Sequence, residues 1–247
     1  MEQNALQLYE SIFKRKSTRK YQPESLSPDQ LSSITAFAAE MKPLHPQIRT
    51  KIELAGAVDV KGMVSAKTPH YLLLYSEKKE GYLQNAGFLL QQADLFLSSL
   101  GLGSCWLGMA KTTAPAKDGL AYVIMLAFGK AQGNPHRESL SEFSRRPLSE
   151  IAKSADERLE AVRLAPSATN SQPWYFVCEG ERIFVYRKKL GVLKAAMSAT
   201  MNRIEMGIAL CHLWLADKHR GQAFSFSADV PGDAPEVDGY RCIGSVN

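Results

Sequence analysis

Residues 165–174 constrain this chain more than any other part of its sequence. They follow a helical pattern over residues 156–164 and precede a strand-like run over residues 174–177. Pro166 cannot continue a helix, and Pro173 disfavours helical geometry at Gln172, which we expect to be extended. The segment is therefore predicted to be a rigid loop with hydroxyl and amide groups at fixed positions. Such a loop suits a planar ligand with polar edges, and it is equally compatible with an ordinary turn.

A second constraint is a basic segment near the start of the chain. Arg15, Ser17 and Arg19 place two guanidinium groups and a hydroxyl close together, at the end of a helical pattern that begins around Asn4. Arginine binds phosphate through a planar fork of N–H donors, and serine adds a short hydrogen bond. The alternative is a solvated basic end to the helix, which the helix dipole favours.

Together, the two segments resemble the nitroreductase family of flavin mononucleotide (FMN) enzymes. Arg15, Ser17 and Arg19 match the family's opening Arg-x-Ser-x-Arg element. Residues 165–174 match its Ala-Pro-Ser-x-x-Asn-x-Gln-Pro-Trp signature. Residues 101–108 are similar to the family's glycine-rich turn after the long central helix, and residues 145–148 are similar to its late basic element.

The order of these elements differs from that of ordinary family members. In those proteins the Ala-Pro-Ser loop follows soon after the opening element, but here residues 42–47 take that place and lack the signature. Ordinary members are homodimers whose flavin sites draw on both subunits. The resemblance therefore implies a fused pseudo-dimer with one complete flavin site, compatible with a monomer. We expect residues 1–144 to form the first half and residues 145–247 the second, around one shared core.

Hydrophobic periodicity gives limited independent support for two related halves. In the first, residues 70–75 and 121–128 are predicted strands around a helix over residues 82–100, with an apolar stripe of Leu89, Ala93, Phe96, Leu97 and Leu100. In the second half, a helix is predicted over residues 202–219, with an apolar stripe of Ile204, Ile208, Cys211 and Leu215. The predicted strands around it are residues 175–178, 183–186, 223–228 and 240–246. A further helix is predicted over residues 28–41. We expect an α+β, nitroreductase-like fold with a central, mostly antiparallel sheet flanked by helices.

Composition narrows the class of protein. The chain has 247 residues, of which 45% are hydrophobic and 22% charged, enough for one large domain or two packed halves. The 4 cysteines lie far apart and mostly in apolar runs, so we expect buried free thiols in the cytoplasm and no metal site. We expect no membrane span and no signal peptide. The net charge of +5 suits an anionic cofactor, and the absence of an aromatic-interleaved stacking motif argues against nucleic acid as a partner.

The resemblance implies an enzyme in which NAD(P)H reduces FMN and the flavin then reduces a small electron-poor molecule, such as a nitroaromatic, a quinone or an activated alkene. Solvent can supply protons, so no side chain is expected to be catalytic. Surface or core positions are expected for the histidines, His45, His70, His136, His212 and His219, and Trp174 is expected to be a core anchor.

The residues that the resemblance assigns to the cofactor are Arg15, Lys16, Ser17, Arg19, Leu107, Gly108, Arg145, Arg146, Pro166, Ser167, Asn170 and Gln172. Lys61, Lys67 and Arg203 are unranked candidates for the pyrimidine edge of the flavin ring. Two alternatives to the enzyme stay open at this point. One is a flavin-binding or sensing protein with little turnover, and the other is a degenerate interaction module without a cofactor.

Overall fold

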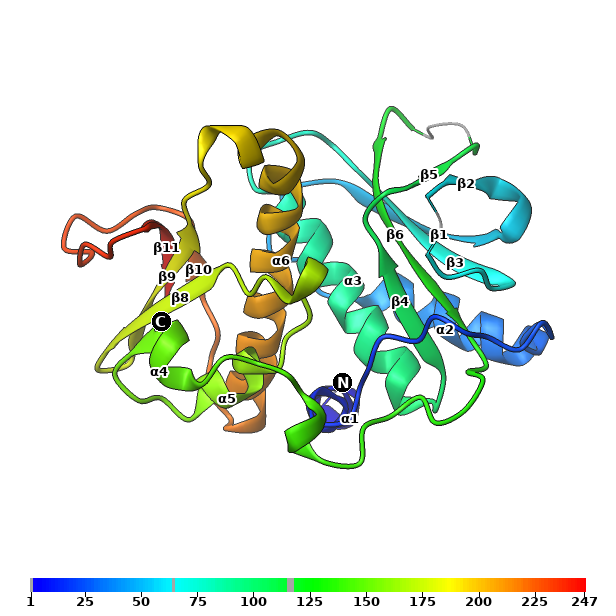
Figure 1. The fold of residues 1–247 in the computed structure, drawn as a ribbon, viewed down its shortest axis with the longest axis horizontal. Coiled ribbons are helices and arrows are strands. Elements are labelled where there is room, and N and C mark those ends of the chain that lie inside the picture. Colours follow the sequence, from blue (N-terminus) through cyan, green and yellow to red (C-terminus); the bar gives the residue numbers. More distant parts are fainter. Residues whose placement is uncertain (1, 64, 115–117) are drawn as a thin grey trace.

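The computed structural model describes residues 2–63, 65–114 and 118–247, without the side chains of residues 2–4 and 192–197. The elements up to residue 129 are α1 (Glu2–Ile12), α2 (Pro28–Glu40), β1 (Thr50–Gly56), η1 (Ala57–Asp59), β2 (Val60–Gly62), β3 (His70–Ser76), α3 (Tyr82–Ser99), β4 (Gly103–Leu107), β5 (Ala110–Thr112) and β6 (Ala121–Gly129). They are followed by η2 (Leu140–Glu142), α4 (Leu148–Ile151), β7 (Ala152–Lys153), α5 (Arg158–Arg163), η3 (Ala168–Asn170), β8 (Trp174–Glu179), β9 (Arg182–Lys188), α6 (Val192–His219), β10 (Phe226–Ser227) and β11 (Tyr240–Val246). Two sheets lie on either side of the long helices α3 and α6 (Figure 1).

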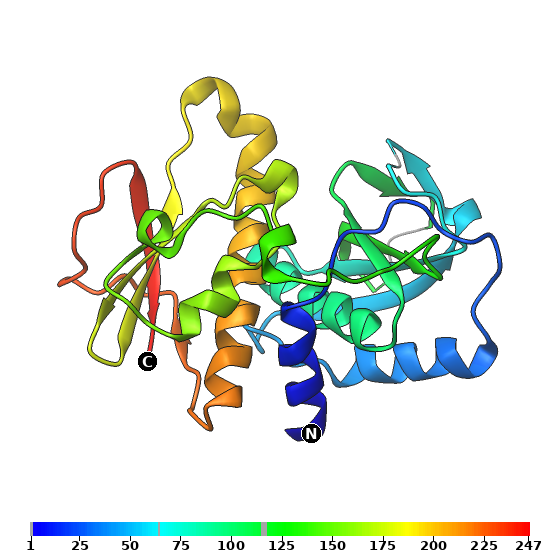
Figure 2. The ribbon, with the colours of Figure 1, turned by 60° about the horizontal axis from the view of Figure 1, so that its bottom comes forward.

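The strands form two principal sheets rather than the single central sheet expected from the sequence. One has the order β1-β3-β6-β4 and the other β10-β11-β9-β8-β7, while β2 and β5 form a separate pair. The β7–β8 pair is parallel and the other strand pairs of the described residues are antiparallel. Figure 2 shows the helices between the two sheets. The mixed α+β class with antiparallel strands is thus confirmed.

The second half of the chain repeats the topology of the first. In chain order, β1, β3, α3, β4 and β6 correspond to β8, β9, α6, β10 and β11. The sheet order β1-β3-β6-β4 is then the same as β8-β9-β11-β10, with β7 added at one edge. An irregularity recurs as well. Val123 is an extra residue in β6 opposite β3, and Ile243 is an extra residue in β11 opposite β9, so each half has a bulge at the same place.

The helices α3 and α6 cross at two glycines. A Cβ atom on Gly87 of α3 would lie 1.9 Å from the carbonyl oxygen of Ile204, and one on Gly207 of α6 would lie 1.9 Å from that of Gln84. Gly207 lies as many positions after Gly87 as Ile204 lies after Gln84, so the contact is reciprocal, as in a twofold interface. The same shift in numbering relates Val123 to Ile243. We call residues related by this shift counterparts.

The predicted elements recur with altered limits. The helix predicted over residues 202–219 begins at Val192, and the strand predicted over residues 223–228 is reduced to Phe226–Ser227. Short strands at β1, β2, β4, β5 and β7 were not predicted, because their sequences lack a sustained apolar alternation. The helix α3 is buried on nearly all sides rather than on one stripe, and Leu100 from the predicted stripe is 44% exposed. The division at residue 144 stays a prediction.

The remaining expectations concern cysteines, metals and membranes. Cys105 and Cys211 are buried, Cys178 and Cys242 are half-buried, and all are free thiols. Trp174 is fully buried, as expected for a core anchor. Within the described residues, no helix combines the length and the apolarity that a membrane crossing needs. No group of three or more His, Cys, Asp or Glu side chains in the same part of the chain could hold a metal ion.

The helix crossing gives a stability prediction. Gly87→Ala and Gly207→Ala each force a methyl group against a backbone carbonyl that cannot rotate away, and we expect each to lower the free energy of unfolding by about 1–3 kcal/mol. This loss would occur although alanine favours a helix over glycine by about 1 kcal/mol. Urea denaturation measures it. Gly56→Ala, where nothing lies within 4 Å of the added Cβ, is the control. Unchanged midpoints in both helix variants would contradict the close crossing.

A buried histidine gives a pH prediction. His212 of α6 is fully buried, with Nδ1 2.7 Å from the carbonyl oxygen of Ala161 and Nε2 3.1 Å from Nε2 of Gln91. Burial, the largest cause, lowers the pKa of His212 to about 3. Below pH 6.5 the unfolded chain therefore binds a proton that the folded chain does not, and stability falls as the pH falls.

For this one group the loss between pH 6.5 and pH 5 is about 2 kcal/mol. In urea denaturation at these two pH values, His212→Gln should show a smaller difference than the unmodified chain by about that amount. His219→Gln, at the exposed end of α6, should retain the full difference. Equal pH dependence in the chain and in His212→Gln would show that this ring is not the group responsible.

Candidate functional site

The basic segment that follows α1 turns inward rather than into solvent. Arg15 is 1% exposed. Its Nη2 donates a hydrogen bond to Oγ of Ser17 at 3.1 Å, and its Nε lies 3.0 Å from a carboxylate oxygen of Asp94 on α3. The hydroxyl of Ser104 on β4 donates to the other carboxylate oxygen of Asp94. Arg15 and Ser17 were predicted from the sequence, but Asp94, the acid that pairs with Arg15, was not, because it belongs to no recognised motif.

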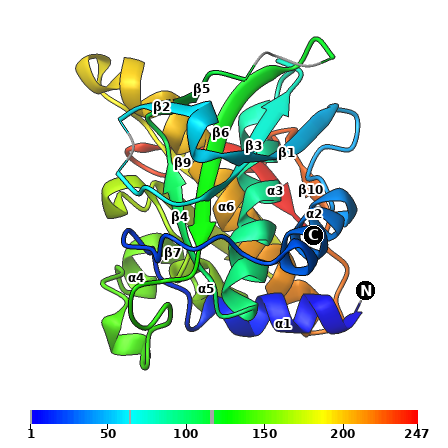
Figure 3. The same ribbon diagram turned by 90° about the vertical axis from the view of Figure 1, so that its right-hand side faces the viewer.

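This segment lies along the edge strand of the first sheet. Ser17 and Ser104 form an isolated parallel bridge, and the backbone N–H of Thr18 donates to the carbonyl of Ser104 at 2.8 Å. Figure 3 shows the blue segment after α1 crossing in front of β4. A Cβ on Gly103 would lie 2.6 Å from the side chain of Thr18, so the close approach requires glycine there.

The expectation of a glycine-rich turn over residues 101–108 was largely wrong, because residues 103–107 form β4. The run of glycines misled the interpretation, since Gly103 makes room for Thr18 rather than for a bend. Leu107 is buried at the end of the strand, and Gly108 is exposed immediately after it. A Cβ on Gly108 would lie 2.9 Å from the sulfur of Met201 on α6. This end of β4 therefore contacts the helix of the other half.

The polar segment over residues 131–144 connects the two halves. Nη1 of Arg137 donates to the carbonyl oxygen of Arg15, and the backbone N–H of Arg137 donates to the carbonyl of Lys14 at 2.7 Å. The guanidinium of Arg137 lies 4.1 Å from the ring centroid of Phe143, and that of Arg145 lies 5.9 Å from the same centroid. Both are within the range of a cation–π contact. Arg137 was not predicted, because it lies outside the motifs that carry the resemblance.

Arg145 reaches the signature loop. Its Nη1 donates to Oδ1 of Asn170 at 2.7 Å, and the amide of Asn170 donates to the carbonyl of Ser144 at 2.6 Å. The backbone N–H of Arg146 donates to Oε1 of Gln172 at 3.0 Å. The late basic element and the signature loop, predicted separately, are therefore one hydrogen-bonded unit.

The loop over residues 165–173 is held in an unusual backbone conformation. Thr169, Asn170 and Gln172 have φ values of 52°, 58° and 46°. The expectation that Pro173 makes Gln172 extended was thus wrong. The N–H of Gln172 donates to Oγ of Ser167 at 2.9 Å and its side chain accepts from Arg146, and these contacts outweigh the local preference. Pro166 is buried, and the side-chain amide of Gln172 donates a hydrogen bond to the carbonyl oxygen of Asn170 within the loop.

A buried carboxylate anchors the loop to α6. Oε1 of Glu205 accepts from the backbone N–H of Ala168 at 2.6 Å, and Oε2 accepts from the hydroxyl of Ser171 at 3.1 Å. Burial raises the pKa of Glu205. The counterpart of Glu205 is Asn85, whose Oδ1 accepts from the backbone N–H of His45 at 3.0 Å. The loop after α2 is therefore attached to α3 as the signature loop is attached to α6.

The arginines between the basic segment and the signature loop are not fully neutralised by nearby carboxylates. Burial, followed by the charges of Arg15, Arg137 and Arg163, lowers the pKa of Arg145 to about 10. Arg163 pairs with Glu160 and Arg15 pairs with Asp94, while the charge of Glu142 acts on Arg137. Arg15, Arg137 and Arg145 therefore exceed the nearby carboxylates in charge, and this excess of positive charge suits the –1.5 to –2 of a phosphate monoester. In the described part of the chain, the buried Nε of Arg145 also has no hydrogen-bond partner. The donor set fits a phosphate group.

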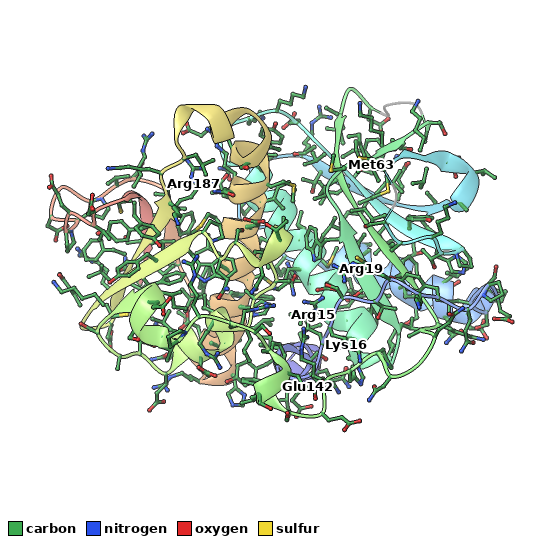
Figure 4. The ribbon with its side chains drawn as sticks, in the orientation of Figure 1. Arg15, Lys16, Arg19, Met63, Glu142 and Arg187 are labelled. Atoms are coloured by element: carbon green, nitrogen blue, oxygen red, sulfur yellow. The ribbon has the colours of Figure 1, made fainter. Side chains whose placement is uncertain are left out.

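The structure connects some of the predicted cofactor residues and leaves others apart. Arg15 and Ser17 are linked through Arg137 and Phe143 to Arg145 and Asn170. Lys16 is half-buried and Arg19 exposed, and Figure 4 shows both near Arg15, in the middle of the molecule between the two sheets. The pyrimidine-edge candidates Lys61, Lys67 and Arg203 are exposed, and their assignment stays a prediction.

Comparisons with known proteins point to one family. A family model described as "Putative TM nitroreductase" matches residues 7–217. The crystal structure of a putative nitroreductase from Thermotoga maritima is similar in fold, with a TM-score of 0.64 and 20% identity over 97% of this chain and 91% of that chain. A putative nitroreductase from Desulfovibrio desulfuricans, in complex with FMN, aligns with a TM-score of 0.46 and 20% identity over 62% of this chain and 96% of that chain. No curated protein matches this chain in sequence.

Proposed function

Because the chain belongs to the nitroreductase family described as "Putative TM nitroreductase", we propose that it is an FMN-dependent oxidoreductase. In this proposal NAD(P)H donates a hydride, and a small nitroaromatic, quinone or related electron-poor molecule receives it through the flavin. The small-molecule substrate is the partner that the proposal requires. We further propose that the protein works in the cytoplasm.

One observation carries the proposal. The Arg-x-Ser-x-Arg segment and the signature loop, far apart in the sequence, are joined by consecutive contacts from Arg15 through Arg137, Phe143 and Arg145 to Asn170. Their excess of positive charge suits a phosphate dianion. An ordinary turn and a solvated helix end, the alternatives for the two segments, do not explain why Arg15 is buried beside Asp94 while Arg137 and Arg145 link it to the signature loop.

The residues of the chain bind and orient, and FMN when bound supplies the redox chemistry by accepting and passing on a hydride. Arg15, Arg137 and Arg145 offer N–H donors to the phosphate group, and Ser17 adds a hydroxyl. Glu205 and Gln172 hold the signature loop so that its polar groups keep fixed positions. No side chain is proposed as an acid or base, because solvent supplies the protons.

We propose that the chain is a pseudo-dimer with one flavin site. The reciprocal glycine crossing and the repeated topology support two related halves. The counterparts of Asp94 and Ser104 are Trp214 and Phe224, which lack the carboxylate and the hydroxyl found beside Arg15. Both line a pocket of about 300 Å³ together with Phe88. Since the second half supplies what a partner subunit would, the chain is proposed to act as a monomer.

The purified chain should carry or take up FMN at one flavin per chain, and the yellow colour should survive gel filtration. NADH or NADPH should bleach the absorbance of the bound flavin, and a nitroarene added without oxygen should restore it. Bound flavin that no nicotinamide cofactor reduces would instead indicate a binding or sensing protein. A chain that takes up no FMN would refute the function, and two flavins per chain would refute the single-site proposal.

Variants on the two sides of the site test its division between the halves. Arg15→Ala removes charge-assisted hydrogen bonds, and we expect FMN affinity to fall by about tenfold or more. Asn170→Ala releases Arg145 from the loop, with an expected loss of about threefold to tenfold. Fluorescence titration measures both. Matched controls are Arg182→Ala, which removes an exposed ion pair with Asp233, and Gln222→Ala, which removes an exposed amide contact with Arg220 after the end of α6. If either site variant keeps full affinity, that residue is misassigned.

A further inference from the structure

Asp94 is a fully buried carboxylate at the centre of the molecule. It lies on α3 and contacts Arg15, which follows α1, and Ser104, on β4. The two carboxylate oxygens have different partners: Oδ2 faces Nε of Arg15, and Oδ1 accepts a hydrogen bond from the hydroxyl of Ser104. One side chain therefore links groups from two other elements at the place proposed for the phosphate.

The fold does not require an acid at this position. The counterpart of Asp94 on α6 is Trp214, whose ring centroid lies 5.4 Å from that of Phe88. The counterpart of Ser104 is Phe224, with its centroid 6.2 Å from that of Phe88. The same arrangement of helix and strand is thus filled by aromatic packing in the other half. A buried ion pair is a weak source of stability compared with such packing, so a functional reason for Asp94 is needed.

The contacts of Arg15 indicate that reason. Its Nε faces Asp94 and its Nη2 donates to Ser17, so two points fix the plane of the guanidinium. Nη1 has no hydrogen-bond partner among the described residues. A guanidinium in a fixed plane loses less freedom when it binds an oxyanion than a mobile one does.

We propose that Asp94 is a positioning residue for phosphate recognition: it fixes the guanidinium of Arg15 without contacting the cofactor, and the hydroxyl of Ser104 holds the carboxylate in place by donating to it. This inference rests on the proposed function. Positioning and charge predict opposite effects on FMN affinity when the carboxylate is removed. Removing the carboxylate raises the net positive charge of the site, which by Coulomb attraction would strengthen phosphate binding. Loss of positioning weakens it.

The test compares FMN with riboflavin, which has the same ring system and lacks the phosphate. In fluorescence titrations of the full chain, Asp94→Asn should bind FMN about tenfold more weakly, as when an outer carboxylate that orients a metal ligand is removed. Its affinity for riboflavin should stay within about twofold of the unmodified chain. Ser104→Ala, a milder change, should weaken FMN binding less and leave riboflavin unaffected.

Two further variants separate positioning from a general loss of structure. Asp217→Asn removes another fully buried carboxylate, paired with Arg158 at 3.0 Å, and should leave the ratio of FMN to riboflavin affinity unchanged. In an Arg15→Ala background, Asp94→Asn should cause almost no additional loss of FMN affinity, because the group that it positions is absent.

Three results would overturn the inference. These are unchanged or tighter FMN binding by Asp94→Asn, an equal loss for FMN and riboflavin, and a full additional loss in the Arg15→Ala background. Failure of the proposed function looks different, because the unmodified chain would then bind neither flavin. If the unmodified chain binds FMN no more tightly than riboflavin, the phosphate site itself is wrong, and Asp94 has nothing to position.

Discussion

The close approach of α3 and α6 at Gly87 and Gly207 is the constraint on which the rest of this structure depends. Each glycine lets the backbone of the other helix come within a distance that no Cβ could accept. Because the contact is reciprocal, it sets the two halves in a twofold-like arrangement, with a sheet outside each helix. Met201 of α6 then lies against the end of β4, and Glu205, one helical turn further on, anchors the signature loop. The candidate site is thus positioned by the packing of the two helices.

Repulsion between the positive charges at the candidate site lowers the stability of the folded chain. Arg15, Arg137 and Arg145 are partly withdrawn from water and repel one another, and burial together with the neighbouring cations lowers the pKa of Arg137 and of Arg145. A stack of Arg137 and Arg145 against Phe143 offsets part of this repulsion. An anion would remove the rest.

The parts of this arrangement that depend on local sequence could be predicted, and the parts that depend on distant contacts could not. The proline that ends the helix before the signature loop, the apolar runs of β3, β6 and β11, and the basic segment near Arg15 each have a local chemical cause. Asp94 and Glu205 have none, because the role of an acid within a long buried helix is clear only once its partner is known. The left-handed conformation of Gln172 likewise comes from Ser167 and Arg146, and local rules predicted the opposite.

In the pseudo-dimer that we propose, the difference between the two halves follows from joining them in one chain. In a homodimer every substitution appears twice, so a residue that serves one site must also be accepted at its symmetric copy. In the proposed pseudo-dimer that restriction is gone, and Asp94 can hold an arginine while its counterpart, Trp214, packs against Phe88. The polar half carries the cost of burying charge, and the aromatic half adds apolar packing at the equivalent position. A fused pseudo-dimer can therefore have a polar site in one half and aromatic packing at the equivalent position of the other, which a symmetric homodimer cannot.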